Sequence, residues 1–268
     1  MNPATVGMAR ITYEIRSYFR APESVFFTFL FPIIMLALFS VAFSSAADIQ
    51  AGPGTSVDYA TYYLPGLVAT GILLSGTQAL GVDIATERSD GTLKRLGGTP
   101  LPVLSYFVGK IGMVLVTTFV QTAILLAVAS LVFGVDLPTD ASRWGVFAGV
   151  LLLGIATSCV LGIAISALPR EGRRATATIV PVVLVLQFIS GVYLPFTQLP
   201  AWLQDVASVF PLRWMASGMR SVFLPQAFES GEPGGSWQVG LGALVLVGWL
   251  VLGTVACVVT FRWNRKDA

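Results

Sequence analysis

Residues 102–133 have the sequence PVLSYFVGKIGMVLVTTFVQTAILLAVASLVF, an apolar run in which Lys110 is the only charged residue. A helix of about 20 apolar residues is long enough to cross the hydrocarbon core of a bilayer. This run is longer than one crossing needs, so we expect its helix to tilt or to extend beyond the membrane. The stretch therefore predicts a transmembrane helix.

Five similar apolar blocks occupy residues 24–47, 62–84, 145–168, 175–195 and 238–261. The first block exceeds the apolar region of a signal peptide, which has about 7 to 15 residues, so we expect it to remain as a span. Of the 268 residues, 55% are hydrophobic and 11% are charged, whereas roughly 25% are charged in a soluble domain. We therefore predict an all-α polytopic membrane protein with six transmembrane helices.

The composition argues against several classes of function. The chain has no histidine, which removes His-ligated metals and histidine proton relays. Its 16 basic and 14 acidic residues are too evenly balanced to indicate nucleic-acid binding. Gly109-Lys110 is followed by isoleucine and not by the serine or threonine of a P-loop. We expect no catalytic residue, no metal and no cofactor on this chain, so any uphill transport needs a partner.

The lysines and arginines outside the spans predict the orientation in the membrane, because basic residues favour cytoplasmic loops. Twelve of them fall on the side that includes both termini: Arg10, Arg16, Arg20, Arg88, Lys94, Arg95, Arg170, Arg173, Arg174, Arg262, Arg265 and Lys266. Three fall on the other side: Arg143, Arg213 and Arg220. Both termini are therefore predicted to be cytoplasmic.

The segment before the first span, residues 1–23, has the periodicity of an amphipathic helix. Apolar side chains recur at helical spacing, from Met8 to Phe19, while Arg10, Glu14 and Arg20 occupy other faces. We expect residues 5–20 to form a helix on the inner membrane surface, where it would act as an anchor in the lipid bilayer.

The inner loop between the second and third spans predicts a short helix over residues 84–98. Gly97-Gly98 can end it, and Thr99-Pro100 begins the next helix. The loop combines an apolar side with charges of both signs, a combination that suits docking of another protein. The alternative is that the loop is charged simply because it faces the cytoplasm.

The outer segment between the fifth and sixth spans, residues 196–225, contains two short apolar helices separated by prolines. We expect a hairpin that dips into the outer leaflet, with Trp202 and Trp214 at the level of the lipid headgroups. The alternative is a pair of amphipathic helices that lies on the surface. The prolines that delimit the segment are Pro195, Pro200 and Pro211.

Small and polar residues within the spans predict how the helices pack. A stripe of small residues runs from Gly154 through Ser158 and Gly162 in the fourth span, and small residues also recur from Gly71 in the second span. Such stripes allow helices to approach closely. The buried amides and hydroxyls could join helices or contact a ligand. These polar residues are Gln78, Thr117, Thr118, Gln121 and Gln187. Asp83 and Lys110 lie near the inner ends, where a charged side chain can reach the interface.

Three patterns together resemble a known family, the permease subunits of type-2 ABC exporters, in particular its daunorubicin-type branch. They are the N-terminal amphipathic helix, a motif in the inner loop, and the outer hairpin from Ser190-Gly191 to Pro211-Leu212. The inner loop is similar to the family's E-R-x-x-G-T-L-x-x-L-x-x-T-P stretch. The matching residues there are Glu87, Arg88, Gly91, Thr92, Leu93, Leu96, Thr99 and Pro100. The likeness covers the whole chain, residues 1–268, as a single domain.

The resemblance implies that residues 84–98 form a coupling helix seated on a separate ATPase, with Glu87 and Arg88 near the contact. It implies two ATPase copies, which carry ATP and Mg²⁺, and a second permease that is the same chain or a paralogue. It further implies a multi-pass protein of the bacterial plasma membrane. Lys94 differs from the acidic residue that many relatives have at that position.

The polar and aromatic residues of the expected pathway favour a drug-like or lipid-like substrate, hydrophobic or amphipathic, because they form no basic channel. The candidate pathway residues are Gln78, Thr117, Gln121, Gln187, Phe188 and Tyr193. Two alternatives remain open at this point: a permease for a polysaccharide or glycolipid, and a membrane scaffold that transports nothing.

Overall fold

A computed structural model describes residues 3–43, 47–51, 54–99, 101–169 and 171–260. Five residues named above therefore lie outside the described ranges: Pro100, Arg170, Arg262, Arg265 and Lys266. The described residues are mostly helical. In this part of the chain the strands are β1 (Ile49–Gln50) and β2 (Ser56–Val57), which pair antiparallel as a small ribbon.

The helices follow the apolar blocks closely. The α-helices are α1 (Pro3–Phe19), α2 (Pro22–Val25), α3 (Phe31–Ala42), α4 (Tyr59–Leu73), α5 (Leu80–Ser89), α6 (Thr92–Gly97), α7 (Val103–Phe133), α8 (Ala141–Ile165), α9 (Ala175–Ile189), α10 (Ala201–Val209), α11 (Pro211–Phe223) and α12 (Val239–Thr260). Two π-helical segments, η1 (Phe26–Leu30) and η2 (Leu74–Ala79), connect α2 to α3 and α4 to α5 without a break. The 3-10 turns are η3 (Gly172–Arg174), η4 (Phe196–Gln198), η5 (Gln226–Gly231) and η6 (Pro233–Gly235).

Aspartate caps explain where two long helices begin, and a glycine explains where a third one ends. The Asp58 carboxylate accepts a hydrogen bond from the Thr61 N–H at 2.9 Å and caps α4. Asp140 caps α8 in the same way. Gly134 ends α7 with a φ of 70°, a left-handed conformation that glycine adopts without steric penalty.

Four helices in the described residues are long and apolar enough to cross a membrane: Tyr59–Ser89, Val103–Phe133, Ala141–Ile165 and Val239–Val259. The other two predicted spans correspond to shorter apolar helices, Phe26–Ala42 and Ala175–Ile189. The structure therefore supports an all-α polytopic membrane protein. The count of six spans stays a prediction.

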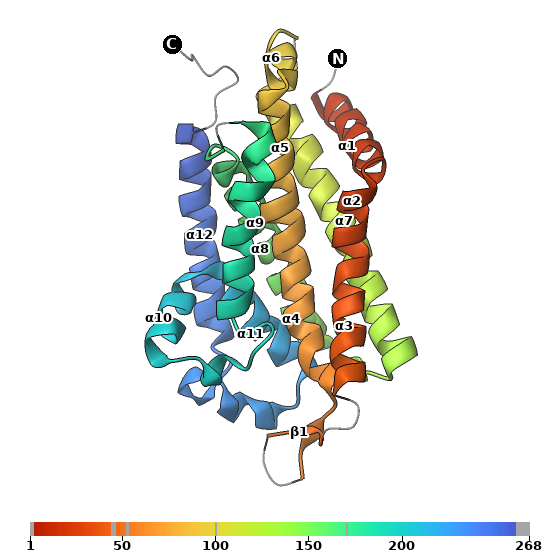
Figure 1. Cartoon of the computed structure of the whole chain (residues 1–268), viewed down its shortest axis with the longest axis vertical. Helices are drawn as coiled ribbons and strands as arrows, with labels where there is room; N and C mark the ends of the chain where they lie inside the picture. Colours follow the sequence, from red (N-terminus) through yellow and green to blue (C-terminus); the bar gives the residue numbers. More distant parts are fainter. Residues whose placement is uncertain (1–2, 44–46, 52–53, 100, 170, 261–268) are drawn as a thin grey trace.

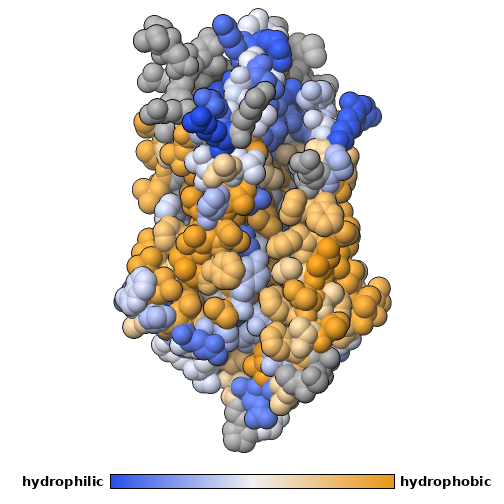
Figure 2. All heavy atoms as spheres, viewed as in Figure 1, coloured by the Kyte–Doolittle hydropathy of each residue, from blue (hydrophilic) through white to orange (hydrophobic). Residues whose placement is uncertain are grey.

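The long helices run roughly side by side, as Figure 1 shows, with α6 at one end of the bundle and the β ribbon at the other. We name these the α6 end and the ribbon end. The start of α1 and the end of α12 lie at the α6 end, and α10 and α11 lie toward the ribbon end (Figure 1). Apolar side chains form a broad belt between the ends, and hydrophilic ones gather at the α6 end (Figure 2). This distribution fits a bundle surrounded by lipid.

Small residues allow the second and fourth predicted spans to touch through their backbones. A Cβ added to Gly162 would lie 2.2 Å from the carbonyl oxygen of Gly76, and one added to Gly76 would lie 2.5 Å from Cβ of Ser158. Nothing larger than glycine fits at such distances. The predicted close packing is therefore confirmed for the stripe in the fourth span; in the second span the contact is made by Gly76, which is not part of the predicted stripe, and Gly71 instead lies against Gln121 of α7.

The N-terminal helix packs more intimately than the sequence predicted. α1 lies along α7, where a Cβ added to Gly109 would stand 2.4 Å from the Arg10 side chain. Glu14 is only 3% exposed, whereas Met8 and Phe19 are exposed. The interpretation of α1 as a simple surface anchor is therefore wrong in this respect: its buried face carries charge, because a cation on α7 lies opposite.

The outer hairpin is divided between an exposed helix and a buried one. α10 exposes Trp202 and Val209, while nearly every residue of α11 is buried in packing against α4, α8 and α12. The alternative of two surface helices is therefore wrong for α11. Trp214 is also not at an exposed headgroup position, because its ring is buried and its indole N–H donates to the Ser208 carbonyl oxygen at 2.7 Å.

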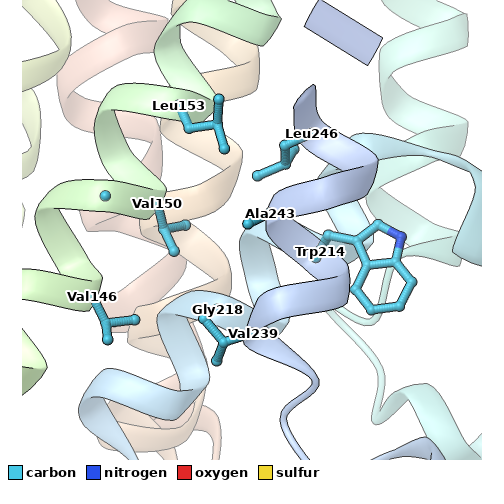
Figure 3. A pocket seen from close by; sticks show the side chains of 10 residues that line it. Val146, Val150, Leu153, Trp214, Gly218, Val239, Ala243 and Leu246 are labelled. Atoms are coloured by element: carbon cyan, nitrogen blue, oxygen red, sulfur yellow. The ribbon is translucent and has the colours of Figure 1, made fainter. Parts of the chain in front are cut away.

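An apolar groove of about 200 Å³ lies between α8, α11 and α12 (Figure 3). Val150, Leu153 and Leu246 line it from two sides, and Trp214 and Gly218 complete the wall. Ligand sites usually place a few polar groups that fix the ligand's orientation, but apolar side chains dominate this wall. We assign the groove to the packing of α12 against the bundle.

Candidate functional site

The inner loop forms two helices, and not the single helix predicted over residues 84–98. Its first part, up to Ser89, continues the long rod of α4, η2 and α5, and α6 follows after a sharp turn. Gly91 makes the turn with a φ of 78°, a left-handed conformation in which a side chain would be strained. The Asp90 carboxylate accepts a hydrogen bond from the Thr92 N–H at 2.9 Å and fixes the start of α6.

The six residues of α6 combine one buried side chain with an exposed basic surface. Leu93 is fully buried against the rest of the chain, and Leu96 is partly buried. Lys94 and Arg95 are exposed, and Arg95 donates to the Thr92 hydroxyl oxygen at 3.0 Å. Leu93 therefore anchors α6 to the rest of the chain, while the charged face of the helix stays exposed.

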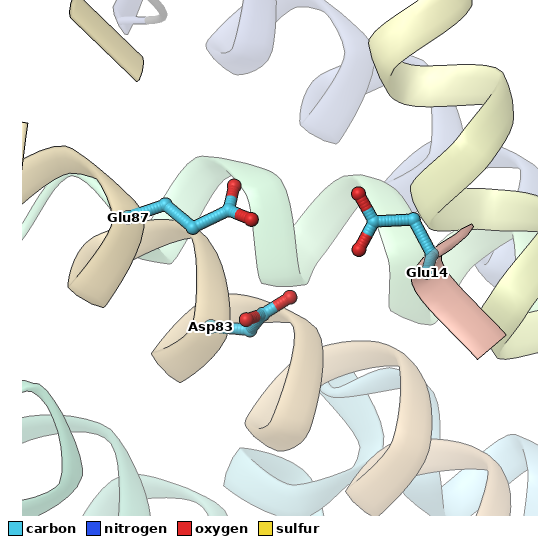
Figure 4. Close-up of side chains that lie close together, drawn as sticks. All are labelled: Glu14, Asp83 and Glu87. Atoms are coloured by element: carbon cyan, nitrogen blue, oxygen red, sulfur yellow. The ribbon is translucent and has the colours of Figure 1, made fainter. Parts of the chain in front are cut away.

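Behind α6, the Lys110 ammonium on α7 bonds to three carboxylates. Its Nζ lies 2.8 Å from Oε2 of Glu14, 2.6 Å from Oδ2 of Asp83 and 2.8 Å from Oε1 of Glu87. Figure 4 shows the three acidic side chains turned toward one another, from α1 and α5. An ammonium has three donors, and here each one finds a carboxylate. We call these four residues the Lys110 cluster.

Two further residues extend the Lys110 cluster. Tyr106, on α7, donates its hydroxyl to Oε2 of Glu87 at 2.7 Å. Arg10, on α1, forms an ion pair with Oε1 of Glu14 at 2.5 Å. The cluster thereby joins α1, α5 and α7 at the α6 end. With Arg10 included, two cations face three carboxylates.

The spacing of the acidic groups alone would suit a metal ion, because a ligand oxygen from each lies within 4.8 Å of the others. The Lys110 ammonium bonds to all three, so the chemistry of this centre is that of an ion-pair network. Lys110 is only 1% exposed. The expectation that its side chain reaches toward the interface is therefore wrong: the charge is neutralised inside the protein.

The sequence did contain a sign of the Lys110 cluster that went unused. A charged residue within a long apolar helix needs a partner, and Asp83 and Glu87 stand one helical turn apart on one face of α5. Glu14 is one turn from Arg10 on α1. Sequence alone could not show that these faces meet.

Arg88 follows Glu87 in α5, but its side chain bonds to the end of α8. Its Nη1 donates to the Ser166 carbonyl oxygen at 2.5 Å, and its Nη2 donates to the Ser166 hydroxyl oxygen at 3.3 Å. Ser166 stands at the end of α8. Both residues predicted near a partner contact, Glu87 and Arg88, are therefore bonded within the chain. Their contact with an ATPase stays a prediction.

Three of the predicted pathway residues come together. The Tyr193 hydroxyl donates to Oε1 of Gln187 at 2.5 Å, and the ring of Phe188 lies 5.3 Å from that of Tyr193. Tyr63 on α4 donates to the Tyr193 carbonyl oxygen at 3.3 Å and stacks on Phe39 at 4.2 Å. These rings link α3, α4 and α9 into one aromatic and amide group.

The other three predicted pathway residues lie apart from that group in the packing of α7 and η2. Thr117 bonds to the backbone of its own helix, through the Met113 carbonyl oxygen at 2.9 Å. Gln121 is 1% exposed and lies close to Gly71 of α4, and its amide has no partner within the part of the chain that the structure describes. Gln78 is partly buried in η2. The structure thus separates the six residues into a ring-rich group and single buried polar side chains.

An apolar-belted helical bundle, with a short basic helix at one end and a helical hairpin toward the other, defines a polytopic membrane protein. The family model of the ABC-2 type transporters matches residues 8–224. The chain belongs to the ABC-2 type transporter family.

Curated relatives extend the likeness. The daunorubicin resistance ABC transporter permease protein DrrB1 of Streptomyces coeruleorubidus is 25% identical over 273 residues, which cover 98% of this chain and 88% of that protein. The probable doxorubicin resistance permease DrrC of Mycobacterium tuberculosis is 26% identical, over 78% of this chain and 71% of its own. The probable multidrug permease YbhR of Escherichia coli is 25% identical over 64% of this chain, and the chain spans only 46% of its length.

Proposed function

We propose that this chain is the permease subunit of an ATP-driven exporter, and that it forms the pathway for a hydrophobic or amphipathic, drug-like or lipid-like molecule. A separate ATPase supplies the energy. The observation that carries the proposal is α6, a helix with a buried leucine and an exposed basic face at the end of a long helical rod. The names of the relatives, which are drug-resistance permeases, support the substrate class.

The contacts behind α6 suggest how force would pass into the bundle. A movement of α6 acts first on α5, to which it is joined through two residues. The Lys110 cluster ties α5 to α1 and α7, and Arg88 ties α5 to the end of α8. In this proposal Glu87 and Arg88 are positioning residues that transmit the movement, and Lys94 and Arg95 meet the ATPase.

The assembly follows from the same reasoning. Six spans place both termini in the cytoplasm of a bacterial cell, with the protein in the plasma membrane. Two ATPase copies bind ATP and Mg²⁺, and a second permease, either this chain or a paralogue, completes the pathway. The excess of basic residues on the side of the termini supports this orientation.

The group formed by Gln187, Phe188 and Tyr193 supports an amphipathic substrate, because aromatic rings offer apolar surface and the amide offers hydrogen bonds. A permease for a polysaccharide or glycolipid is the nearest alternative. A scaffold without transport activity is the other, and a stable complex that contains no ATP-binding partner would favour it.

The test is to isolate the chain from its native membrane, to ask whether an ATPase co-purifies, and to measure ATP turnover with and without this subunit. We expect the pair Lys94→Glu and Arg95→Glu to reduce the stimulation of ATP turnover by about tenfold or more, because reversed charges repel the surface that the native ones attract. Arg16→Glu is the control, since Arg16 is equally exposed but lies on α1. Full stimulation by the double variant would refute docking through α6.

A further inference from the structure

Toward the ribbon end, α11 carries two arginines on one buried face. Arg213 and Arg220 stand seven residues apart, which is about two helical turns, and they are 3% and 5% exposed. Both bond to Glu232 in the segment after α11. Arg213 Nη2 lies 2.9 Å from its Oε2, and Arg220 Nε lies 2.6 Å from its Oε1. Glu232 is itself 8% exposed.

These three residues leave an excess of positive charge and of hydrogen-bond donors. Two guanidinium groups face one carboxylate. Arg220 Nη1 donates to the Gly191 carbonyl oxygen at 3.1 Å. Among the described residues, Arg220 Nη2 has no partner, and neither do Nε and Nη1 of Arg213. Burial lowers the pKa of Arg213 to about 10, which leaves its guanidinium charged at neutral pH. Buried donors without a partner are costly, so the arrangement suits an additional anion.

The two arginines differ in what surrounds them. Arg213 lies over the ring of Phe196, with its Cζ 4.1 Å from the ring centroid. This stacking and the bond to Glu232 hold Arg213 in place. Arg220 instead forms part of the wall of a cavity of about 400 Å³, together with its partner Glu232. Arg213 is therefore the positioning residue, and Arg220 is the one available to a ligand.

The walls of this cavity combine apolar and polar side chains, as the binding of an amphipathic ligand requires. Tyr62, Phe228 and Trp237 supply aromatic surface, and Thr197 and Ser230 supply exposed hydroxyls. β1 and the residue after it close another side of the cavity. An apolar body can pack on the rings while a charged group reaches Arg220.

We propose that this cavity binds a phosphate group, either free or on the headgroup of a lipid, and that Arg220 is the residue that binds it. The planar fork of a guanidinium matches phosphate oxygens, and the phosphate would supply the negative charge that Glu232 leaves unmatched. The inference goes beyond the proposed function, because such binding requires no ATPase.

A charge placed at the mouth of the cavity tests the proposal without disturbing the buried residues. Thr197→Glu adds a carboxylate next to the site, and Thr197→Gln adds a side chain of the same size without charge. Thr197 is exposed, so both variants should fold. We expect Thr197→Glu to weaken phosphate binding by about tenfold or more and Thr197→Gln to leave it nearly unchanged.

Arg220→Gln tests the binding residue directly, and we expect it to abolish saturable binding. Arg174→Gln is its control, because Arg174 is exposed and pairs with Glu171 outside the cavity. Size-exclusion chromatography reports whether each variant is folded. Should Arg220→Gln fail to fold, the Thr197 pair still decides the question.

The measurements use the full chain in nanodiscs of phosphatidylcholine, titrated with inorganic phosphate. A parallel sample contains phosphatidylglycerol, and mass spectrometry identifies the lipid retained after extraction in detergent. Saturable phosphate binding supports a soluble anion, and selective retention of phosphatidylglycerol supports a lipid headgroup. The proposal is overturned if phosphate binding is not saturable and phosphatidylglycerol is not retained. It is also overturned if Thr197→Glu and Thr197→Gln have equal effects. Because no ATPase is present, its failure is distinct from failure of the proposed function.

Discussion

The two buried charge clusters of this protein are built in opposite ways. At the α6 end, Lys110 is enclosed by three carboxylates, and acceptors are in excess. Toward the ribbon end, Glu232 is shared by Arg213 and Arg220, and donors are in excess. The first cluster joins three helices, and one of them, α1, is far in sequence from the other two. The second joins one helix to the segment that follows it and borders a cavity.

The difference shows how to separate a structural charge cluster from a receptive one. In the Lys110 cluster each donor of the ammonium has an acceptor, so the cation needs nothing more. In the arginine pair, three guanidinium nitrogens have no partner among the described residues, and Arg220, which carries one of them, borders a cavity. Buried charge alone is therefore a poor guide to a binding site. What separates the two clusters is the sign of the excess charge, which is negative around Lys110 and positive around Arg213 and Arg220.

Replacing Lys110 with methionine should have the largest effect on stability. Three carboxylates would lose their shared cation, and breaking a buried ion pair from one side costs about 3 kcal/mol or more. The apparent melting temperature in detergent and the yield of monodisperse protein measure the change. Lys94→Met is the control, since Lys94 is exposed. A Lys110→Met protein as stable as the wild type would show that the cluster holds no helices together.

Replacing Glu232 with glutamine should come second. Two buried guanidinium groups would then face each other without a carboxylate, and we expect a loss of about 2 kcal/mol from the unmatched charge. The same melting measurement applies. Glu229→Gln serves for comparison, because the Glu229 carboxylate accepts from the neutral Trp237 N–H, at 3.3 Å, and forms no ion pair among the described residues. Equal stability of the two variants would contradict the excess of donors that we describe.

Replacing Glu87 with glutamine should be much milder, with a loss below about 1 kcal/mol. Glutamine keeps an oxygen for Tyr106 or Lys110, and the cluster with Arg10 still has as many carboxylates as cations. The contrast with Glu232→Gln is the sharpest test of the comparison, since the same chemical change removes an excess charge at one end and a needed one at the other. A larger loss of stability in Glu87→Gln than in Glu232→Gln would contradict the comparison of the two clusters.

The smallest effect is expected from combining Glu87→Gln with Lys110→Met. Removing one carboxylate from a cluster that has lost its cation should recover part of the stability, so the double variant should melt slightly above Lys110→Met alone. Additive losses would indicate that the two residues do not interact. The readout is the difference in apparent melting temperature between the single and double variants.

Much of the fold could be predicted from the sequence because bilayer helices depend on long apolar runs. The helix over residues 102–133 and the apolar hairpin before the last span follow from that rule. The close contact of Gly76 with Gly162 could be anticipated from stripes of small residues. These features depend on local composition.

The charge clusters could not be predicted, because they depend on which helix faces meet. Lys110 was visible as a charge in an apolar run, but its partners come from residues as distant as Glu14. The sequence places Arg213 and Arg220 among the charges of the outer side, and their seven-residue spacing puts them on one helix face, but it does not show that both meet Glu232. Periodicity shows that two residues share a face, and only the packed structure shows what that face meets.

The way α6 is joined to the bundle separates two kinds of sequence change. Leu93 is the one fully buried side chain of α6. Gly91 turns the backbone before α6, and a Cβ added there would have no atom of the described residues within 4 Å. Substitutions at Lys94 and Arg95 therefore leave the packing behind them intact. Under the proposed docking, we expect an exchange of this six-residue helix between two permeases to exchange the ATPase that each one binds.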